Sequence, residues 1–143
     1  MSEALSPAPR TDGTLVSVLG FETLELGRDR ARSKVEVGDR HRQPYGTVHG
    51  GVYAALAESI ASEATAVAVY EDGKIAMGMS NFVTFMRPIS SGTVHAEAIR
   101  KHAGSTTWIW EVEMTDDEGR LCASARVTVA VRPRPQGPSP GSG

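Results

Sequence analysis

The feature that most constrains the fold of this chain is residues 52–69, a run that contains neither glycine nor proline. The run is dense in alanine, the residue with the highest helix propensity. Its large apolar residues recur at close to helical spacing, at Val52, Leu56, Ile60 and Val67. We therefore expect one long helix, against which the rest of the chain must pack.

Polar residues interrupt the apolar character of this helix: Glu58, Ser59, Ser62, Glu63 and Thr65. A membrane span of about 20 residues would not tolerate them, so we expect no membrane partner. Glu58 lies among small apolar residues, where an unpaired buried carboxylate would cost several kcal/mol, and must face water, a partner or a substrate. With Ser62 and Thr65 it forms one polar stripe, although a stripe that merely faces solvent is the alternative interpretation.

Strand-like patterns flank the helix on both sides. Two runs precede it, residues 21–26 and 31–37, and four follow it, residues 76–85, 93–101, 106–114 and 121–131. The turns between the later runs are short and contain Gly, Pro, Ser and Asp, which favours antiparallel neighbours. The order predicts an α+β domain, with the apolar face of the helix laid across one antiparallel sheet.

Length and composition limit the domain count and the partner classes. A chain of 143 residues fits one domain, which we place at residues 14–132, between Pro, Gly and Ser-rich ends (1–13 and 133–143) that we expect to be disordered. The formal net charge of -2 argues against nucleic acid as a partner. Cys122 is the single cysteine, and no secretory signal pattern opens the chain, so we expect a cytoplasmic protein.

Several familiar chemistries lack their motifs in this sequence. It contains no G-x-S-x-G elbow, no phosphate-binding G-x-x-x-x-G-K-[ST] and no G-x-G-x-x-G after a strand. The four histidines show no metal-ligand spacing, so we expect no metal. Cys122 falls in a strand-like run and is expected to be a small core residue rather than a nucleophile.

The residues that enter the helix, His49, Gly50 and Gly51, offer a different chemistry. Amides at a helix N-terminus can hold an anion or a developing oxyanion, and glycine allows close approach, although a simple tight turn explains the pattern equally well. Gly50 and Glu58 are about 12 Å apart at roughly 1.5 Å per helical residue, so one carbonyl cannot contact both. A site that uses both must take them from two chains, as in a two-fold dimer with antiparallel helices.

The motifs around this helix resemble those of a known family. The segments QPYGTVHGG (43–51) and AALAE (54–58) resemble the hotdog thioesterases of the phenylacetate-pathway type. The later segments 80–81, 85–88, 103–108 and 119–123 are similar to bacterial 4-hydroxybenzoyl-coenzyme A thioesterase with its carboxylate on the central helix. The resemblance covers about residues 21–134.

The resemblance implies a hotdog fold, in which a curved antiparallel sheet wraps a long helix, and a homodimer that pairs into a tetramer. It implies that Glu58 attacks the thioester carbonyl or activates water, while the Gly50 amide and the Gln43 side chain of the partner stabilise the oxyanion. Ser62, where the family has threonine, would orient water. Coenzyme A is part of the substrate, and no separate cofactor is expected.

The remaining site residues also come from the resemblance. His49 would contact the substrate, Glu63 would accept a bond from a phenol hydroxyl, and Arg87, Ser105 and Thr106 would hold the phosphates of coenzyme A. Taken alone, the turn at 104–106 is more typical of an ordinary hairpin and Arg87 of a solvated strand end. A solvated helix carboxylate explains Glu63 equally well. Phenylacetyl or another aryl thioester remains an alternative substrate. So do two other classes, a hotdog hydratase or dehydratase acting through His49 and a non-catalytic acyl-coenzyme A binder.

Overall fold

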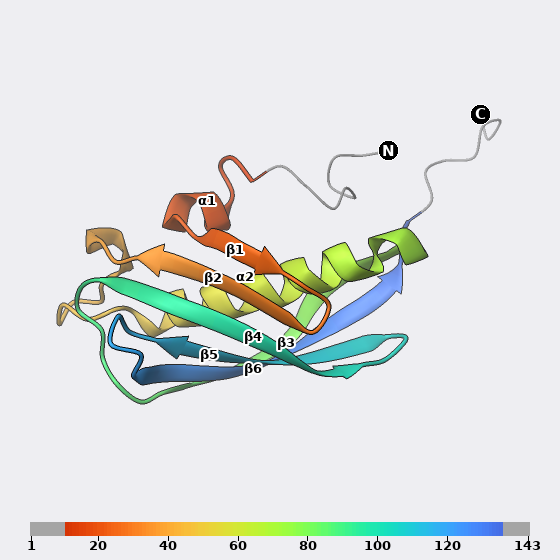
Figure 1. Cartoon of the computed structure of the whole chain (residues 1–143). Helices are drawn as coiled ribbons and strands as arrows, with labels where there is room; N and C mark the ends of the chain where they lie inside the picture. Colours follow the sequence, from red (N-terminus) through yellow and green to blue (C-terminus); the bar gives the residue numbers. More distant parts are fainter. Residues whose placement is uncertain (1–10, 136–143) are drawn as a thin grey trace.

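One long helix lies across a curved six-stranded antiparallel sheet in the computed structural model, which describes residues 11–135 (Figure 1). The helix is α2 (Gly50–Val69), extended by a 3-10 turn, η3 (Tyr70–Asp72). The strands are β1 (Glu22–Leu26), β2 (Arg30–Glu36), β3 (Lys74–Phe85), β4 (Thr93–Ala103), β5 (Thr107–Thr115) and β6 (Leu121–Pro133). The predicted α+β hotdog architecture is confirmed.

The predicted elements are present, with small differences at their ends. Helix α2 begins at Gly50 rather than Val52, because the His49 side chain caps it by accepting a hydrogen bond from the Gly51 amide at 2.8 Å. A short helix, α1 (Leu15–Leu19), and a 3-10 turn, η2 (Asp39–His41), were not predicted. Both are too short to show a periodic apolar pattern.

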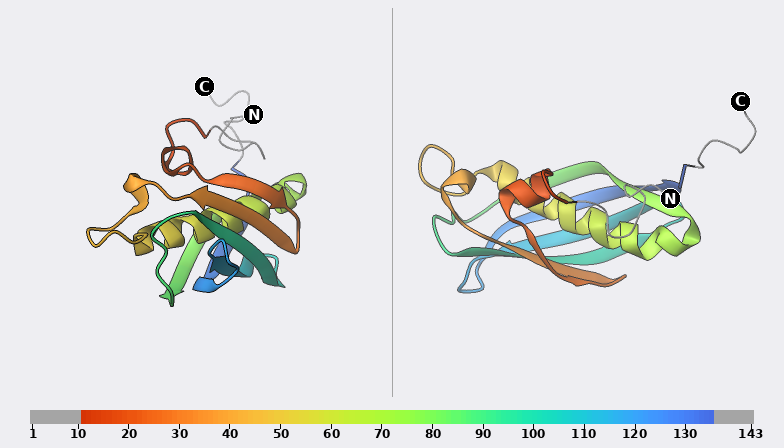
Figure 2. Two further views of the ribbon diagram at one scale, coloured as in Figure 1. Left: turned by 60° about the vertical axis from the view of Figure 1, so that its left-hand side comes forward. Right: turned by 90° about the horizontal axis from the view of Figure 1, so that it is seen from above.

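The strands follow the order β1-β2-β4-β5-β6-β3 across the sheet. Strand β3 comes directly after the helix but pairs with the last strand, β6, so it forms one edge while β1 forms the other. The sheet curves around one side of α2, as two further views show (Figure 2). Within the described chain, the outer edge of β3 has no neighbouring strand.

The core lies between α2 and the middle of the sheet. Its largest fully buried side chains include Leu56 and Ile60 from α2 and Trp110 and Met114 from β5. Burying such a side chain stabilises the fold by roughly 1.5–3 kcal/mol. Cys122 is fully buried at the start of β6, as predicted, and burial raises the pKa of its thiol, so it is a core residue.

Two further predictions concern the helix and the chain ends. By length and apolar content alone, Gly50–Asp72 could span a membrane, but the apolar residues of α2 pack on the sheet, as in the core helix of a globular domain. The expected disorder of residues 1–13 and 133–143 falls largely outside the described residues and stays a prediction. Strand β6 itself continues through Pro133, one residue beyond the predicted domain boundary.

Candidate active site

The Glu58 side chain lies against the edge strand of the sheet. Glu58 is exposed, and its carboxyl carbon is so close to Gly78 of β3 that a Cβ on this glycine would lie 2.9 Å away. Directly after Gly78, a bulge at Met79 shifts the pairing of β3 with β6. Within residues 11–135, the Glu58 carboxylate has no hydrogen bond or ion pair, so it is free to act on a ligand.

A second contact between α2 and β3 lies one helical turn before Glu58. Asn81 Nδ2 donates to the backbone carbonyl of Ala54 at 2.9 Å. In an α-helix this carbonyl also accepts the amide of the residue four positions on, which is Glu58. Asn81 therefore fixes the turn of α2 that carries Glu58 relative to the edge strand.

The start of α2 makes the third contact, with the end of β3. A Cβ on Gly50 would lie 2.7 Å from Cζ of Phe85, so only glycine allows the ring to approach the helix this closely. Gly50 is the first residue of α2, where the amide N–H has no intrahelical acceptor, and no acceptor for it is found in the described chain. This N–H can therefore donate to an anion or an oxyanion.

A pocket opens beside this amide, with a volume of about 320 Å³. It is lined by Thr47, Gly50, Tyr53, Phe85, Met86, Arg87 and Pro88. Tyr53 is buried and its ring packs against Phe85, with a centroid distance of 5.9 Å and a tilt of 46°. Burial raises the pKa of the Tyr53 hydroxyl to about 12, so it stays protonated at neutral pH.

Gln43 lies in the loop before α2 and contacts Thr47, which lines the pocket. Its Nε2 donates to Oγ1 of Thr47 at 2.6 Å, and its Oε1 accepts the amide of Tyr45 at 2.5 Å. Thr47 lines the pocket together with Gly50. The structure therefore places Gln43 beside the helix start, with its carbonyl end bound to the loop and one amide hydrogen left to donate.

His49 acts as the N-cap of α2. Because the Gly51 amide donates to its Nδ1, a neutral ring must carry its proton on Nε2. The exposed Nε2 then presents a donor rather than a base. This arrangement suits a substrate contact and weakens the hydratase alternative, in which His49 would have to accept a proton.

The predicted polar stripe on α2 is only partly solvent-facing. Thr65 is fully buried, and its hydroxyl donates to the Ala61 carbonyl at 2.7 Å and accepts from Nε1 of Trp110 at 2.9 Å. The alternative of a solvated stripe is therefore wrong for Thr65, because the helix crosses the sheet and turns this position inward. The Ser62 hydroxyl is buried and has no partner in the described residues.

Glu63 lies on another side of the helix. Thr23 of β1 donates its hydroxyl to Oε2 of Glu63 at 2.9 Å. Glu63 thus faces the β1 edge of the sheet, whereas Glu58 lies on Gly78 at the β3 edge. One chain alone does not bring the two carboxylates together.

Arg87 and the Ser105–Thr106 turn are also separated within one chain. Arg87 lines the pocket at the end of β3, next to the point where Phe85 pairs with Ala123 of β6. The turn precedes Thr107, which pairs with Ala130, about 23 Å further along β6 at roughly 3.3 Å per residue. Arg87 therefore cannot share one phosphate group with the turn of its own chain.

The turn has two basic neighbours, Lys74 and Arg132. Nζ of Lys74 donates to the Ser105 carbonyl at 3.2 Å, and Arg132 donates to the Thr106 carbonyl at 2.5 Å. Neither cation has a carboxylate partner within the described chain. Lys74 was missed because the pairing of β3 with β6 places it there, and no local pattern indicates that pairing.

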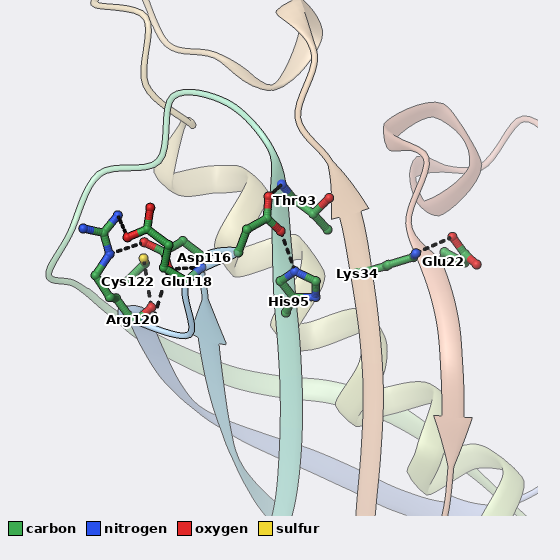
Figure 3. A network of polar contacts seen from close by, with 9 residues as sticks. Glu22, Lys34, Thr93, His95, Asp116, Glu118, Arg120 and Cys122 are labelled. Carbon is green, nitrogen blue, oxygen red and sulfur yellow. Dashed lines mark hydrogen bonds and ion pairs between the residues drawn. The ribbon is translucent and has the colours of Figure 1, made fainter.

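Two of the other histidines, His41 and His95, serve structural contacts. His41 is buried, accepts the Gly38 amide on Nδ1 at 2.9 Å and lies 2.7 Å from the Leu19 carbonyl through Nε2. His95 of β4 bonds Asp117 at 2.8 Å in the polar cluster at one end of the sheet (Figure 3). The His95 bond and the Thr93 amide lower the pKa of the Asp117 carboxyl. No group of three metal-ligating side chains occurs among residues 11–135.

Comparisons with known proteins found a matching family model and several similar chains. Residues 45–123 match the family model described as "Thioesterase superfamily". The proofreading thioesterase EntH of Cronobacter turicensis is 36% identical over 119 residues, which cover 83% of this chain and 86% of the relative. The crystal structure of a thioesterase from Haemophilus influenzae has a TM-score of 0.80 and 34% identity, covering 85% of each chain.

A thioesterase from Staphylococcus aureus is similar at 25% identity, with a TM-score of 0.80, covering 83% of this chain and 98% of that one. Its structure was solved as a variant in which a glutamine is replaced by alanine. A second structure of the same protein carries a glutamate-to-alanine change.

Proposed function

Because this chain belongs to the thioesterase superfamily, and is an enzyme of the thioester-hydrolase class, we propose that its substrate is an aromatic acyl-coenzyme A. The best candidate is 4-hydroxybenzoyl-coenzyme A, which would yield 4-hydroxybenzoate and coenzyme A. The observation that carries the proposal is the position of Glu58. Its carboxylate is exposed and unpaired in the described chain, and it lies against Gly78 in the edge strand β3. A cytoplasmic location is part of the proposal.

The free edge of β3 supports a homodimer as the active unit. Four large apolar side chains are exposed along this strand in a single chain, Met77 (56%), Met79 (51%), Phe82 (75%) and Phe85 (56%). An unpaired strand edge with exposed apolar residues is a template for another strand, and a second copy pairs with it by a two-fold axis. Two such dimers would form the homotetramer that the resemblance implies.

The contacts between α2 and β3 suggest a position for this axis. Along β3, Gly78 is next to Glu58 and Phe85 is next to Gly50. For Gly50 of the partner subunit to approach Glu58, Phe85 of the partner subunit must lie opposite Gly78. The two-fold axis then passes near Asn81 and Phe82, midway between these positions.

The same pairing would bring the phosphate-binding candidates together. An antiparallel β3 pair centred on Asn81 and Phe82 places Arg87 of one chain near the Lys74 end of the other. Ser105 and Thr106 lie at that end, because Lys74 contacts the Ser105 carbonyl. Arg87, Ser105 and Thr106 could then bind the phosphates of one coenzyme A from two chains.

The proposed reaction uses one carboxylate and one set of donors. The Gly50 amide, assisted by Gln43, would stabilise the tetrahedral oxyanion, a contribution of about 3 to 4 kcal/mol per donor. Glu58 would either attack the carbonyl, giving an anhydride that water opens, or remove a proton from the attacking water. In both routes the C–S bond breaks, coenzyme A leaves as its thiol, and the acid is released.

Three further side chains would assist. The Ser62 hydroxyl, four residues after Glu58 and without a partner in the described chain, would orient water after a change of rotamer. His49 would donate from Nε2 to the substrate. Glu63 would accept the phenol hydroxyl of a 4-hydroxybenzoyl group if the substrate displaces its bond from Thr23.

The Staphylococcus aureus relative gives independent support. The glutamine and the glutamate that were replaced in its two structures are 15 positions apart, as Gln43 and Glu58 are here. The choice of these two residues for replacement in that protein is consistent with the roles proposed for Gln43 and Glu58.

The test is thiol release from a panel of aryl and alkyl acyl-coenzyme A substrates by wild type and Glu58→Gln. We expect the variant to fold normally and to turn over an aroyl thioester at least about a hundredfold more slowly. Glu71→Gln, an exposed glutamate in η3, is the matched control and should retain full activity. Wild-type turnover by Glu58→Gln would exclude this carboxylate, and binding of the thioester without thiol release would favour a non-catalytic binder.

A further inference from the structure

The residues that line the pocket beside Gly50 can determine which acyl group the thioesterase accepts. This inference rests on the proposed function. We propose that Phe85 is the specificity-determining residue, and that its ring is the wall on which an aromatic acyl group packs. The ring already contacts the residue whose amide would bind the thioester oxygen.

The close approach of the Phe85 ring to Gly50 is the first argument. A bound carbonyl oxygen lies about 3 Å from its donor N–H group. The tip of the Phe85 ring touches Gly50 so closely that a Cβ there would be only 2.7 Å from Cζ. The first substituents of the carbonyl carbon can therefore lie within van der Waals reach of this ring.

The chemistry of the walls favours the acyl substituent over the pantetheine arm. Four of the seven lining residues, Tyr53, Phe85, Met86 and Pro88, have aromatic or apolar side chains, whereas Thr47, Gly50 and Arg87 provide the polar part of the lining. Pantetheine carries two amides, which lose free energy in such surroundings unless they find hydrogen-bond partners. An aryl ring needs no such partners and gains from tilted or stacked contact with another ring.

The Phe85 ring is held in place yet partly uncovered. Tyr53, only 3% exposed, supports it from the helix side at a centroid distance of 5.9 Å. Phe85 itself is 56% exposed in a single chain, so one side of the ring is left uncovered by its own subunit. A supported ring with a free face is the arrangement expected of a specificity wall rather than of a core residue.

An exposed apolar residue at the opposite edge of the sheet provides a control. Leu24 of β1 is 43% exposed and does not line the pocket. Phe82 of β3 is unsuitable, because the proposed two-fold axis passes near it. Of Phe85 and Leu24, only Phe85 lines the pocket, so only Phe85 should affect the choice of acyl group.

The experiment measures kcat/KM for benzoyl-coenzyme A and acetyl-coenzyme A in wild type, Phe85→Ala, Phe85→Leu and Leu24→Ala. Benzoyl is used because it lacks the hydroxyl that would involve Glu63. We expect Phe85→Ala to reduce the preference for benzoyl over acetyl about tenfold or more. Phe85→Leu should lose less, since it keeps apolar contact, and Leu24→Ala should keep the wild-type ratio.

Two results would overturn the inference. An unchanged ratio in Phe85→Ala would show that the ring does not contact the acyl group. An equal rise of KM for both thioesters would mean that it contacts the pantetheine arm instead. If Phe85→Ala does not fold, the ratio in Phe85→Leu decides between the same outcomes. Lack of thiol release by the wild-type enzyme would instead contradict the proposed function itself.

Discussion

The two halves of helix α2 differ in how far their polar groups are bonded within one chain. The first half, from Gly50 to Glu58, contacts the edge strand β3 through glycines at positions 50 and 78 and leaves its amide and its carboxylate without partners in the described chain. In the second half, Thr65 pairs with Trp110, and the Ala68 carbonyl accepts a hydrogen bond from Arg28 at 3.0 Å. Apart from the Ser62 hydroxyl, the second half is complete within a single chain, whereas the first half is available to bind.

This difference shows where stability and activity are located. Satisfied buried hydrogen bonds and close packing stabilise the second half, where a lost partner costs free energy. Missing Cβ atoms and unpaired polar groups in the first half contribute little to stability but define a site. Mutations in the two halves should therefore affect different measurements.

The largest expected effect is at the start of the first half. Gly50→Pro removes the amide donor, while the extended conformation of His49 (φ -65°, ψ 136°) and the first helical position both tolerate proline. We expect kcat to fall about 10²–10³-fold. Gly50→Ala, which brings a similar Cβ against Phe85 but keeps the N–H, is the control. Equal activity in the two variants would remove the amide from the mechanism.

Gly78→Ala should have the next largest effect, again on activity. The new Cβ would lie 2.9 Å from the carboxyl carbon of Glu58 and displace this flexible side chain. We expect kcat to fall about tenfold with KM nearly unchanged, because the reacting group loses its position while the binding residues do not. A normal unfolding temperature would accompany the loss, and unaltered kcat would show that Gly78 does not seat Glu58.

In the second half, Thr65→Val should reverse this pattern. The substitution leaves the Nε1 donor of Trp110 buried without its acceptor, which costs about 1–3 kcal/mol of stability. Denaturant unfolding measures the loss, and Thr65→Ser, which keeps the hydroxyl, should recover most of it. Activity per folded molecule should stay at the wild-type level, and a large fall in kcat would contradict the division of roles between the two halves.

The smallest effect is expected at the surface pair of Asp117 and His95, outside both halves. The lowered pKa of Asp117 means that the folded state binds its proton less readily than the unfolded state. The contribution of Asp117 to the stability of the fold is present above the unfolded pKa near 3.8. It is lost as the pH falls through the lower pKa of the folded state. Asp117→Asn should thus lower the unfolding temperature slightly at neutral pH and not at about pH 2. An equal decrease at both pH values would argue against the ionised pair.

The sequence predicted local features better than long-range ones. The alanine-rich run indicated α2, and alternation with turn residues indicated all six strands. The position of β3 at the edge, which exposes Phe82, could not be predicted, because pairing between β3 and β6 leaves no local pattern. Thr65 was assigned to a polar stripe because spacing shows which residues share a helix side but not how far that side is buried.

The same limit applies to the site. Glu58 and Gly50 could be selected from the sequence because each stands out locally. A carboxylate surrounded by alanines is unusual, and so is a pair of glycines directly before a helix. Gly78 and Phe85 were missed as contacts, since each matters only through a residue of α2 that is distant in the sequence. An isolated glycine inside a strand is the one signal that could have indicated Gly78.

The central claim is that each site combines Glu58 of one chain with Gly50 of the other, and subunit complementation tests it directly. Glu58→Gln and Gly50→Pro chains, each inactive alone, are refolded together so that half of the dimers are mixed. A shared site predicts that each mixed dimer regains one intact site, giving about a quarter of wild-type thioesterase activity. Activity no higher than that of the separate variants would mean that the two groups act within one chain, or not together at all.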